Sequence, residues 1–338
     1  DPEKVAMLPL DWSILRNHAI LISGATGMIG SFLVDLILYK NLHHELGCTV
    51  YALGRSEAKG KQRFSAFWDS PWFHFICCDI NQGINMDHVS ADYIIHAASN
   101  THPVAYATDP IGTVTTNIIG TYNLLEYAAA NHTKRFVFAS SVEIYGENRG
   151  DTAYFSEEYC GYIDCNTLRA GYPESKRAGE ALCQAFIRQK GLDVVIPRLS
   201  RVYGPTMLMS DTKALSQFIK NALSGEDIVL KSEGTQFFSY SYVADAGSGI
   251  LYCMCNGENG QAYNIADPAS DITLRELAGT IANQAGTQVI FQIPDAVERA
   301  GYSKATRAVL DSSKLRSLGW SAMWNIETGI RQTLKILR

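Results

Sequence analysis

The sequence lacks three features, and each absence excludes a class of protein. Its eight cysteines form no C-x-x-C pair and no zinc-type spacing with histidine, so a metal site is not expected. It lacks a basic excess, with a formal net charge of -5, whereas nucleic-acid binding needs a basic stripe. It also lacks a visible signal peptide and an uninterrupted apolar run of membrane-spanning length. We expect a cytoplasmic protein with reduced thiols whose partners are neither nucleic acid nor a membrane.

Apolar residues, in contrast, are plentiful. They make up 46% of the 338 residues, against 19% charged residues, which excludes a disordered chain. A chain of this length is too long for a single small domain, and it fits one large domain plus a smaller lobe.

Short apolar runs recur along the first two hundred residues. The first, at 19–22, is continuous, as expected of a strand buried on both faces of a parallel sheet. Similar runs follow at 50–53, 73–78, 93–95, 136–138 and 194–196. Helical patterns separate several of them, among them residues 117–131. The alternation predicts an α/β fold with a Rossmann-like, doubly wound parallel sheet.

The pattern changes after about residue 200. Gly204-Pro205 marks a break, a helix is predicted over 212–223, and residues 240–252 again have the composition of main-sheet material. We therefore expect an NAD-binding Rossmann domain over residues 1–200, joined by 239–252. A smaller α/β substrate-binding lobe is expected over 201–238 and 253–338.

A glycine-rich turn joins the first predicted strand to the first predicted helix. Glycine lets the backbone approach a pyrophosphate, and a helix N-terminus offers N–H donors and partial positive charge. In this context the glycines predict a dinucleotide site rather than a plain tight turn. The predicted contacts are Gly24, Thr26, Gly27, Met28, Ile29 and Gly30.

The end of the second predicted strand leaves two dinucleotides open. An acidic residue there would bind the ribose hydroxyls of NAD, but the sequence reads Leu53-Gly54-Arg55-Ser56. Arg55 could pair with the 2′-phosphate of NADP, or be a solvated loop charge. Asp79 and Ile80, after the third strand, are expected at the adenine.

Tyr172 and Lys176 are spaced i and i+4, which places them on one face of a helix. Pro173 is tolerated only in a first turn, so the helix should begin at Tyr172. A nearby ammonium, together with the positive nicotinamide ring of the cofactor, is expected to lower the pKa of the tyrosine. Tyr172 would then take the proton of an alcohol as its hydride leaves for the cofactor, while Lys176 holds the nicotinamide ribose.

These motifs resemble the NAD-dependent epimerase/dehydratase family of extended short-chain dehydrogenases/reductases, nearly end to end. Further matching pieces are His96-Ala97-Ala98, residues 117–126, residues 140–146, Val202-Tyr203-Gly204-Pro205 and Leu318-Gly319-Trp320. The resemblance implies a nucleotide-activated sugar as substrate, NAD as a retained cofactor and a homodimer. It implies that Ser141 hydrogen-bonds the reacting hydroxyl. It also places Ala97, Ala98 and Asn117 at the cofactor, and Ser99 and Val142 at the substrate.

Within the family, the chain is most similar to UDP-glucuronate decarboxylases. By this resemblance Glu143 stands near C5 and C6 of the sugar, where a carboxylate is a candidate base; a structural carboxylate is the other interpretation. Val142 replaces the serine of decarboxylases and the aspartate of dehydratases. Valine cannot donate a proton, so 4,6-dehydration by the usual route is not expected.

Two arginines are candidates for contacts with a substrate phosphate. Phe238 stands where the family has an arginine, and Arg201 stands where it has an asparagine. We hypothesise that Arg201 partly replaces the missing guanidinium at a phosphate, with a surface ion pair as the alternative. Arg307 is a further candidate for a phosphate contact.

The predicted reaction follows from the residues that are present. Oxidation at C4 followed by re-reduction needs only Ser141, Tyr172, Lys176 and the cofactor, which favours an epimerase or a related C4-oxidation enzyme. The alternatives are decarboxylation assisted by Glu143, an NADP-dependent reductase, and a non-catalytic dinucleotide sensor.

Overall fold

The computed structural model describes residues 1–84, 86, 89–101, 106, 108–292 and 306–338. Its main sheet is built from β1 (Ala19–Ser23), β2 (Thr49–Gly54), β3 (Phe73–Cys77), β4 (Tyr93–His96), β5 (Arg135–Phe138), β6 (Ser140–Ser141), β7 (Val194–Leu199) and β11 (Ala262–Ile265). The strand order is β11-β7-β5-β4-β1-β2-β3, with β6 paired to β7. The recorded pairings within this sheet are parallel. The predicted doubly wound Rossmann-like sheet is confirmed.

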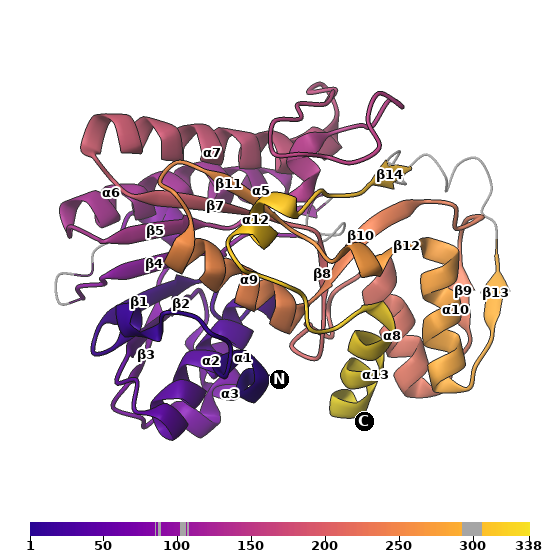
Figure 1. The fold of residues 1–338 in the computed structure, drawn as a ribbon, viewed down its shortest axis with the longest axis horizontal. Helices are drawn as coiled ribbons and strands as arrows, with labels where there is room; N and C mark the ends of the chain where they lie inside the picture. The colour runs from indigo at the N-terminus through magenta and orange to yellow at the C-terminus, as the bar shows by residue number, and fades with distance from the viewer. Residues whose placement is uncertain (85, 87–88, 102–105, 107, 293–305) are drawn as a thin grey trace.

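Alternation along each buried strand fills two cores, one on each face of the sheet (Figure 1). Successive side chains of a strand point to opposite faces. Ile20 and Ile22 of β1 pack in the core beneath α2 (Met28–His44) and α9 (Val243–Asn256). Leu21 packs in the core beneath α6 (Thr121–Ala130) and α7 (Gly171–Lys190). Continuous apolar runs are needed because both faces are covered.

The helix predicted over 117–131 is interrupted. The chain forms α5 (Pro110–Thr115), then a π-helical turn Thr116–Gly120, and only then α6. Helix α7 begins at Gly171, one residue before the predicted start, and keeps Pro173 in its first turn. The remaining short helices outside the second sheet are α1 (Pro2–Ala6), α3 (Glu57–Arg63) and α12 (Ser313–Ser317).

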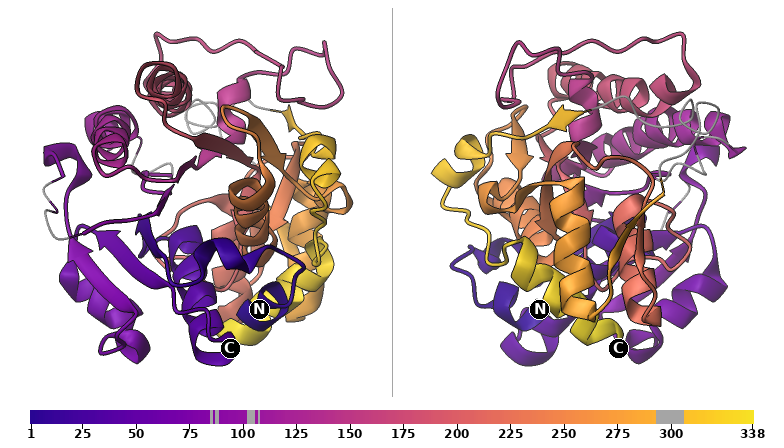
Figure 2. Two further views of the ribbon diagram at one scale, coloured as in Figure 1. Left: turned by 60° about the vertical axis from the view of Figure 1, so that its left-hand side comes forward. Right: turned by 90° about the vertical axis from the view of Figure 1, so that its right-hand side faces the viewer.

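A second layer of structure lies beside the main sheet (Figures 1 and 2). Its strands are β8 (Arg201–Tyr203), β10 (Phe237–Tyr242), β12 (Asp271–Thr273) and β14 (Arg307–Ala308), in the order β12-β10-β14 with β8 paired to β10. A separate pair joins β9 (Ile228–Leu230) to β13 (Val289–Phe291). The helices here are α8 (Ala214–Ser224), α10 (Leu274–Ala285) and α13 (Ile326–Leu337).

Residues 240–252 do not supply a strand to the main sheet. They end β10 of the second sheet and then form α9, whereas the later strand that joins the main sheet is β11, beside β7. Helix α9 is buried on nearly all sides, and periodicity cannot distinguish a fully buried helix from a buried strand. The division into two lobes near residue 200 stays a prediction.

Among the residues that the structure describes, the helices are too short or too polar to span a bilayer.

Candidate active site

A cavity of about 1760 Å³ opens at the carboxyl ends of the main-sheet strands and extends to the second sheet. This is the edge at which open α/β sheets bind ligands. The volume exceeds the roughly 300–1,000 Å³ of a single small-molecule site, so there is room for a dinucleotide and a second ligand. The sequence-predicted residues that line it are Gly24, Thr26, Gly27, Met28, Ile29, Gly30, Arg55, Asp79, Ile80, Ala97, Ala98, Ser99, Ser141, Val142, Glu143, Tyr172 and Arg201.

The glycine turn fits a pyrophosphate. Gly24 has φ +68°, and a Cβ there would lie 2.7 Å from the Cα of Ala98. A Cβ on Gly30 would lie 2.4 Å from the carbonyl oxygen of Gly24, so the helix packs tightly on the turn. Helix α2 follows with Gly27 as its N-cap and without a side-chain cap. Its first N–H groups are therefore available to an anion.

The ribose end of the cavity is neutral or basic. A Cβ on Gly54 would lie 2.9 Å from the ring of Phe75, so this position has no room for the acidic side chain that binds ribose hydroxyls. Arg55, Ser56 and Lys59 line the cavity beyond it. Asp79, beyond β3, accepts a hydrogen bond from the backbone N–H of Asn81 at 3.0 Å. The choice between NAD and NADP is therefore not decided by a carboxylate here.

Tyr172 lies in the first turn of α7, 7% exposed, with its phenol facing the Ser141 hydroxyl. Burial raises the pKa of Tyr172 to about 12, although the Ser141 hydrogen bond opposes the shift. In the protein by itself, removal of the phenolate from water outweighs the favourable contacts, and the predicted lowering of this pKa in the presence of the nicotinamide ring stays a prediction.

Lys176 lies one turn further along α7 and is 2% exposed. Its Nζ donates a hydrogen bond to the carbonyl oxygen of Ala139 at 2.8 Å, and burial lowers its pKa to about 8. Lys176 therefore lies behind the cavity wall, between Tyr172 and the end of β5.

Asn117 is also buried behind the wall. Its Oδ1 accepts a hydrogen bond from Ser99 at 2.7 Å, and its Nδ2 donates to Ser175 at 2.9 Å. Asn117 thus joins the loop after β4 to the helix that carries Tyr172, and it lies in the π-helical turn.

Glu143 lies between two arginines at the edge of the cavity. It follows Ser141 in a 3₁₀ turn, and its N–H donates to the Ser141 hydroxyl at 3.2 Å. Arg169 donates to one carboxylate oxygen at 3.1 Å, and Arg201 Nη2 lies 3.6 Å from the other. The guanidinium of Arg201 stacks 3.6 Å from the ring centre of Phe238. The residues predicted to choose the reaction are thus brought together.

Two residues of this cluster had no role in the sequence prediction. Arg169 pairs with Glu143, and the ring of Tyr106 lies 5.1 Å from that of Tyr172. Both also line the cavity. Neither was given a role in the site from the sequence, because they come from separate segments that only the fold brings together.

Arg307 does not join the cluster. It lies in β14 outside the cavity lining, where its Nε donates to the carbonyl oxygen of Ala153 at 3.2 Å. Its guanidinium packs over Phe237, the neighbour of Phe238 on β10. Because successive strand residues point to opposite faces, β10 presents Phe238 to the cavity and Phe237 away from it.

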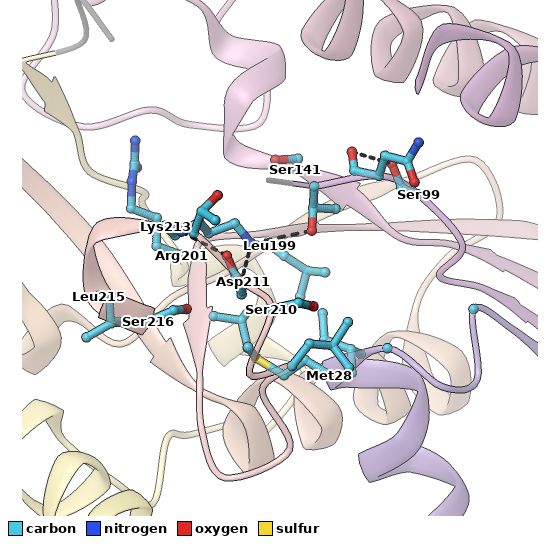
Figure 3. Close-up of a pocket in the computed structure, with 18 of the residues that line it drawn as sticks. Met28, Ser99, Ser141, Leu199, Arg201, Ser210, Asp211, Lys213, Leu215 and Ser216 are labelled. Atoms are coloured by element: carbon cyan, nitrogen blue, oxygen red, sulfur yellow. Dashed lines mark hydrogen bonds and ion pairs between the residues drawn. The ribbon is translucent and has the colours of Figure 1, made fainter. Parts of the chain in front are cut away.

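The segment after β8 reaches across to the glycine turn. The hydroxyl of Thr206 donates to the carbonyl oxygen of Met28 at 2.8 Å. Lys213 pairs with Asp211 at 3.5 Å and donates to Thr101 at 3.4 Å. Figure 3 shows Lys213 and Asp211 on the side of the cavity that faces Ser99 and Ser141. The sequence prediction gave these contacts no role.

Comparisons with known proteins agree with this geometry. The model of the NAD-dependent epimerase/dehydratase family matches residues 20–266. UDP-glucuronic acid decarboxylase 6 of Arabidopsis thaliana is 30% identical over 93% of this chain and 87% of its own length. UDP-glucuronic acid decarboxylase 1 of Xenopus tropicalis is 30% identical over 94% and 72%.

Solved structures share the fold. A UDP-glucose 4-epimerase of Thermotoga maritima has a TM-score of 0.80 at 24% identity, over 95% of this chain and 98% of its own. A UDP-glucuronic acid 4-epimerase of Bacillus cereus, in complex with UDP-glucuronic acid and NAD, has a TM-score of 0.77 at 21% identity, over 94% and 98%.

Proposed function

The chain belongs to the NAD-dependent epimerase/dehydratase family, and we propose that it modifies a nucleotide-activated sugar by transient oxidation of the C4 alcohol. The supporting observation is that Tyr172 and Ser141 line the same cavity as the glycine turn. This arrangement serves a hydride-transfer enzyme. A dinucleotide sensor has no use for it.

In this proposal Ser141 orients the substrate hydroxyl and Tyr172 takes its proton. NAD, when bound, supplies the hydride acceptor and the positive charge of its ring. With a pKa of about 12, Tyr172 holds its proton at neutral pH in the protein by itself. A further positive charge at the phenol would favour the phenolate. Lys176, with a pKa of about 8, still carries its charge at pH 7.

The step after oxidation has two candidates. Epimerisation needs no group beyond Ser141, Tyr172, Lys176 and the cofactor. Decarboxylation is favoured by the likeness to the decarboxylases and by the charged cluster of Glu143, Arg169 and Arg201. Each carboxylate oxygen of Glu143 faces a guanidinium. These surroundings suit a carboxylate that orients the two arginines as well as they suit a general base. Val142 is buried and has no proton to give.

The test begins with the nucleotide that the purified protein releases on denaturation. Retained NAD supports internal redox cycling, whereas an empty site that binds only NADPH supports the reductase suggested by Arg55. Thermal-shift screening against UDP-, CDP-, GDP- and dTDP-sugars then identifies the best binder for product analysis. Tyr172→Phe should lower turnover of that sugar by roughly 10²- to 10⁴-fold. No response to any sugar would overturn the assignment.

We also propose a homodimer and a cytoplasmic location. Large apolar side chains are exposed on and near the helices on the α6/α7 face, among them Ile111, Ile119, Tyr122 and Leu168. Sedimentation of wild type and of Ile111→Lys would test the dimer, since a charge in a buried interface should shift the protein to monomer.

A further inference from the structure

Arg201 has hydrogen-bonding capacity that the described residues do not use. Its Nη1 is shielded from solvent and has no hydrogen-bond partner among them. Its Nη2 lies 3.6 Å from Glu143, which is an ion-pair distance but too long for a good hydrogen bond. A guanidinium carries five N–H donors, and a buried donor without an acceptor is unfavourable. Nη1 itself is out of reach of the cavity, but the Arg201 side chain is 24% exposed and lines the cavity, so a ligand there would meet the exposed part of the guanidinium.

The guanidinium of Arg201 packs against an aromatic ring before any ligand arrives. Its carbon lies 3.6 Å from the ring centre of Phe238, and Phe238 is itself buried in the core. One face of Arg201 is therefore covered, and its edge carries the donors. A rigid guanidinium edge matches a planar group with two oxygens, such as a carboxylate.

Arg201 lies at the end of the cavity where the alcohol would react. It approaches Glu143, which follows Ser141 by two residues and donates its N–H to the Ser141 hydroxyl. Ser141 in turn lines the cavity beside Tyr172. In a uronic acid the carboxylate is attached to C5, the neighbour of the C4 carbon, whereas the diphosphate hangs from C1 across the ring.

The local charge leaves room for one more anion. Arg169 and Arg201 carry two positive charges, and Glu143 carries the one negative charge that pairs with both. A single carboxylate on the substrate would balance the cluster, and a neutral hydroxymethyl group would leave it positive.

From these observations we propose that Arg201 binds a carboxylate of the reacting sugar, so that the substrate is a nucleotide-activated uronic acid rather than a neutral hexose. The inference rests on the proposed function, because it assigns the substrate class of that same site. Arg201 is then the residue that distinguishes acidic from neutral sugars.

The experiment compares UDP-glucuronic acid, UDP-glucose and UDP as probes of the full-length protein, by calorimetric titration. Arg201→Gln keeps a polar side chain but removes the charge. Arg188→Gln removes an arginine charge from an exposed position on α7, outside the cavity lining, and serves as the control. Circular dichroism and bound NAD content establish that each variant is folded.

We expect wild type and Arg188→Gln to bind UDP-glucuronic acid roughly 10- to 100-fold more tightly than UDP-glucose, as a charge-assisted bidentate contact would give. Arg201→Gln should remove this preference and leave UDP-glucose unchanged. Phe238→Leu should reduce the preference without removing the charge, because the guanidinium loses its support.

Two results would overturn the inference while the proposed function stands. One is a wild type that does not prefer the acidic sugar. The other is an Arg201→Gln variant that weakens all three probes equally, which would place Arg201 at the diphosphate. If none of the probes binds even to wild type, the inference fails, and the broader sugar-nucleotide screen decides whether the proposed function fails with it.

Discussion

Replacing Lys176 by methionine should change how stability depends on pH. Burial lowers the pKa of Lys176 from 10.5 to about 8, which corresponds to about 3 kcal/mol of unfavourable free energy for the charged folded form. Between these pH values the unfolded chain holds a proton here that the folded protein has lost. The contribution of Lys176 to stability therefore rises with pH from about 8 to about 10.5, and Lys176→Met lacks that rise.

The assay is urea denaturation of wild type and Lys176→Met at a series of pH values from 7 to 11. The difference in unfolding free energy should shift by about 3 kcal/mol in favour of wild type across the range. Lys176→Met also loses the hydrogen bond to Ala139. This loss lowers the unfolding free energy by the same amount at every pH, so it does not change how the difference depends on pH. Lys190→Met, at the exposed end of the same helix, should keep the wild-type profile. Parallel profiles for wild type and Lys176→Met would refute the reasoning.

Three further substitutions test the framework of the site. Gly24→Ala puts a Cβ 2.7 Å from a backbone carbon in a left-handed conformation, so we expect both NAD content and melting temperature to fall. Unchanged NAD content would contradict the assignment of the glycine turn to the pyrophosphate. Glu180→Gln breaks the largely buried pair with Arg198, which is 2.6 Å long with side chains 14% and 11% exposed, and should cost about 3 kcal/mol in urea denaturation; a loss below about 1 kcal/mol would mean that solvent screens the pair. Burial raises the pKa of Asp245 to about 7, so this group loses stabilising effect as pH rises from 4 to 7; Asp245→Asn should remove that part of the pH profile, and an unchanged melting profile would count against it.

The parts of the fold that could be predicted from the sequence are those with a local cause. The run at 19–22 is continuous because both faces of β1 are covered, and Gly24 is glycine because its backbone is left-handed against Ala98. Tyr172 could be placed because its spacing to Lys176 and the proline between them constrain the helix.

What could not be predicted depends on contacts between distant segments. Residues 240–252 looked like main-sheet material, and only their tertiary surroundings make them the end of β10 and a helix buried on nearly all sides. The pKa of Tyr172 is set by the depth of its burial, which no spacing reveals. Arg201 was recognised as unusual, but its stacking on Phe238 joins two strands that are far apart in the chain.

The segment after β8 bears on the thermodynamics of the proposed reaction. Thr206 contacts Met28 at the start of α2, and Lys213 contacts Thr101, so this segment would help to enclose a dinucleotide that lies over the glycine turn. It would leave only when this segment moves aside, so electrons removed from the sugar would return to the same sugar. The direction of the reaction would then follow from its equilibrium constant and from the concentrations of the substrate and its products. The ratio of oxidised to reduced cofactor in the surrounding solution would have no influence on it.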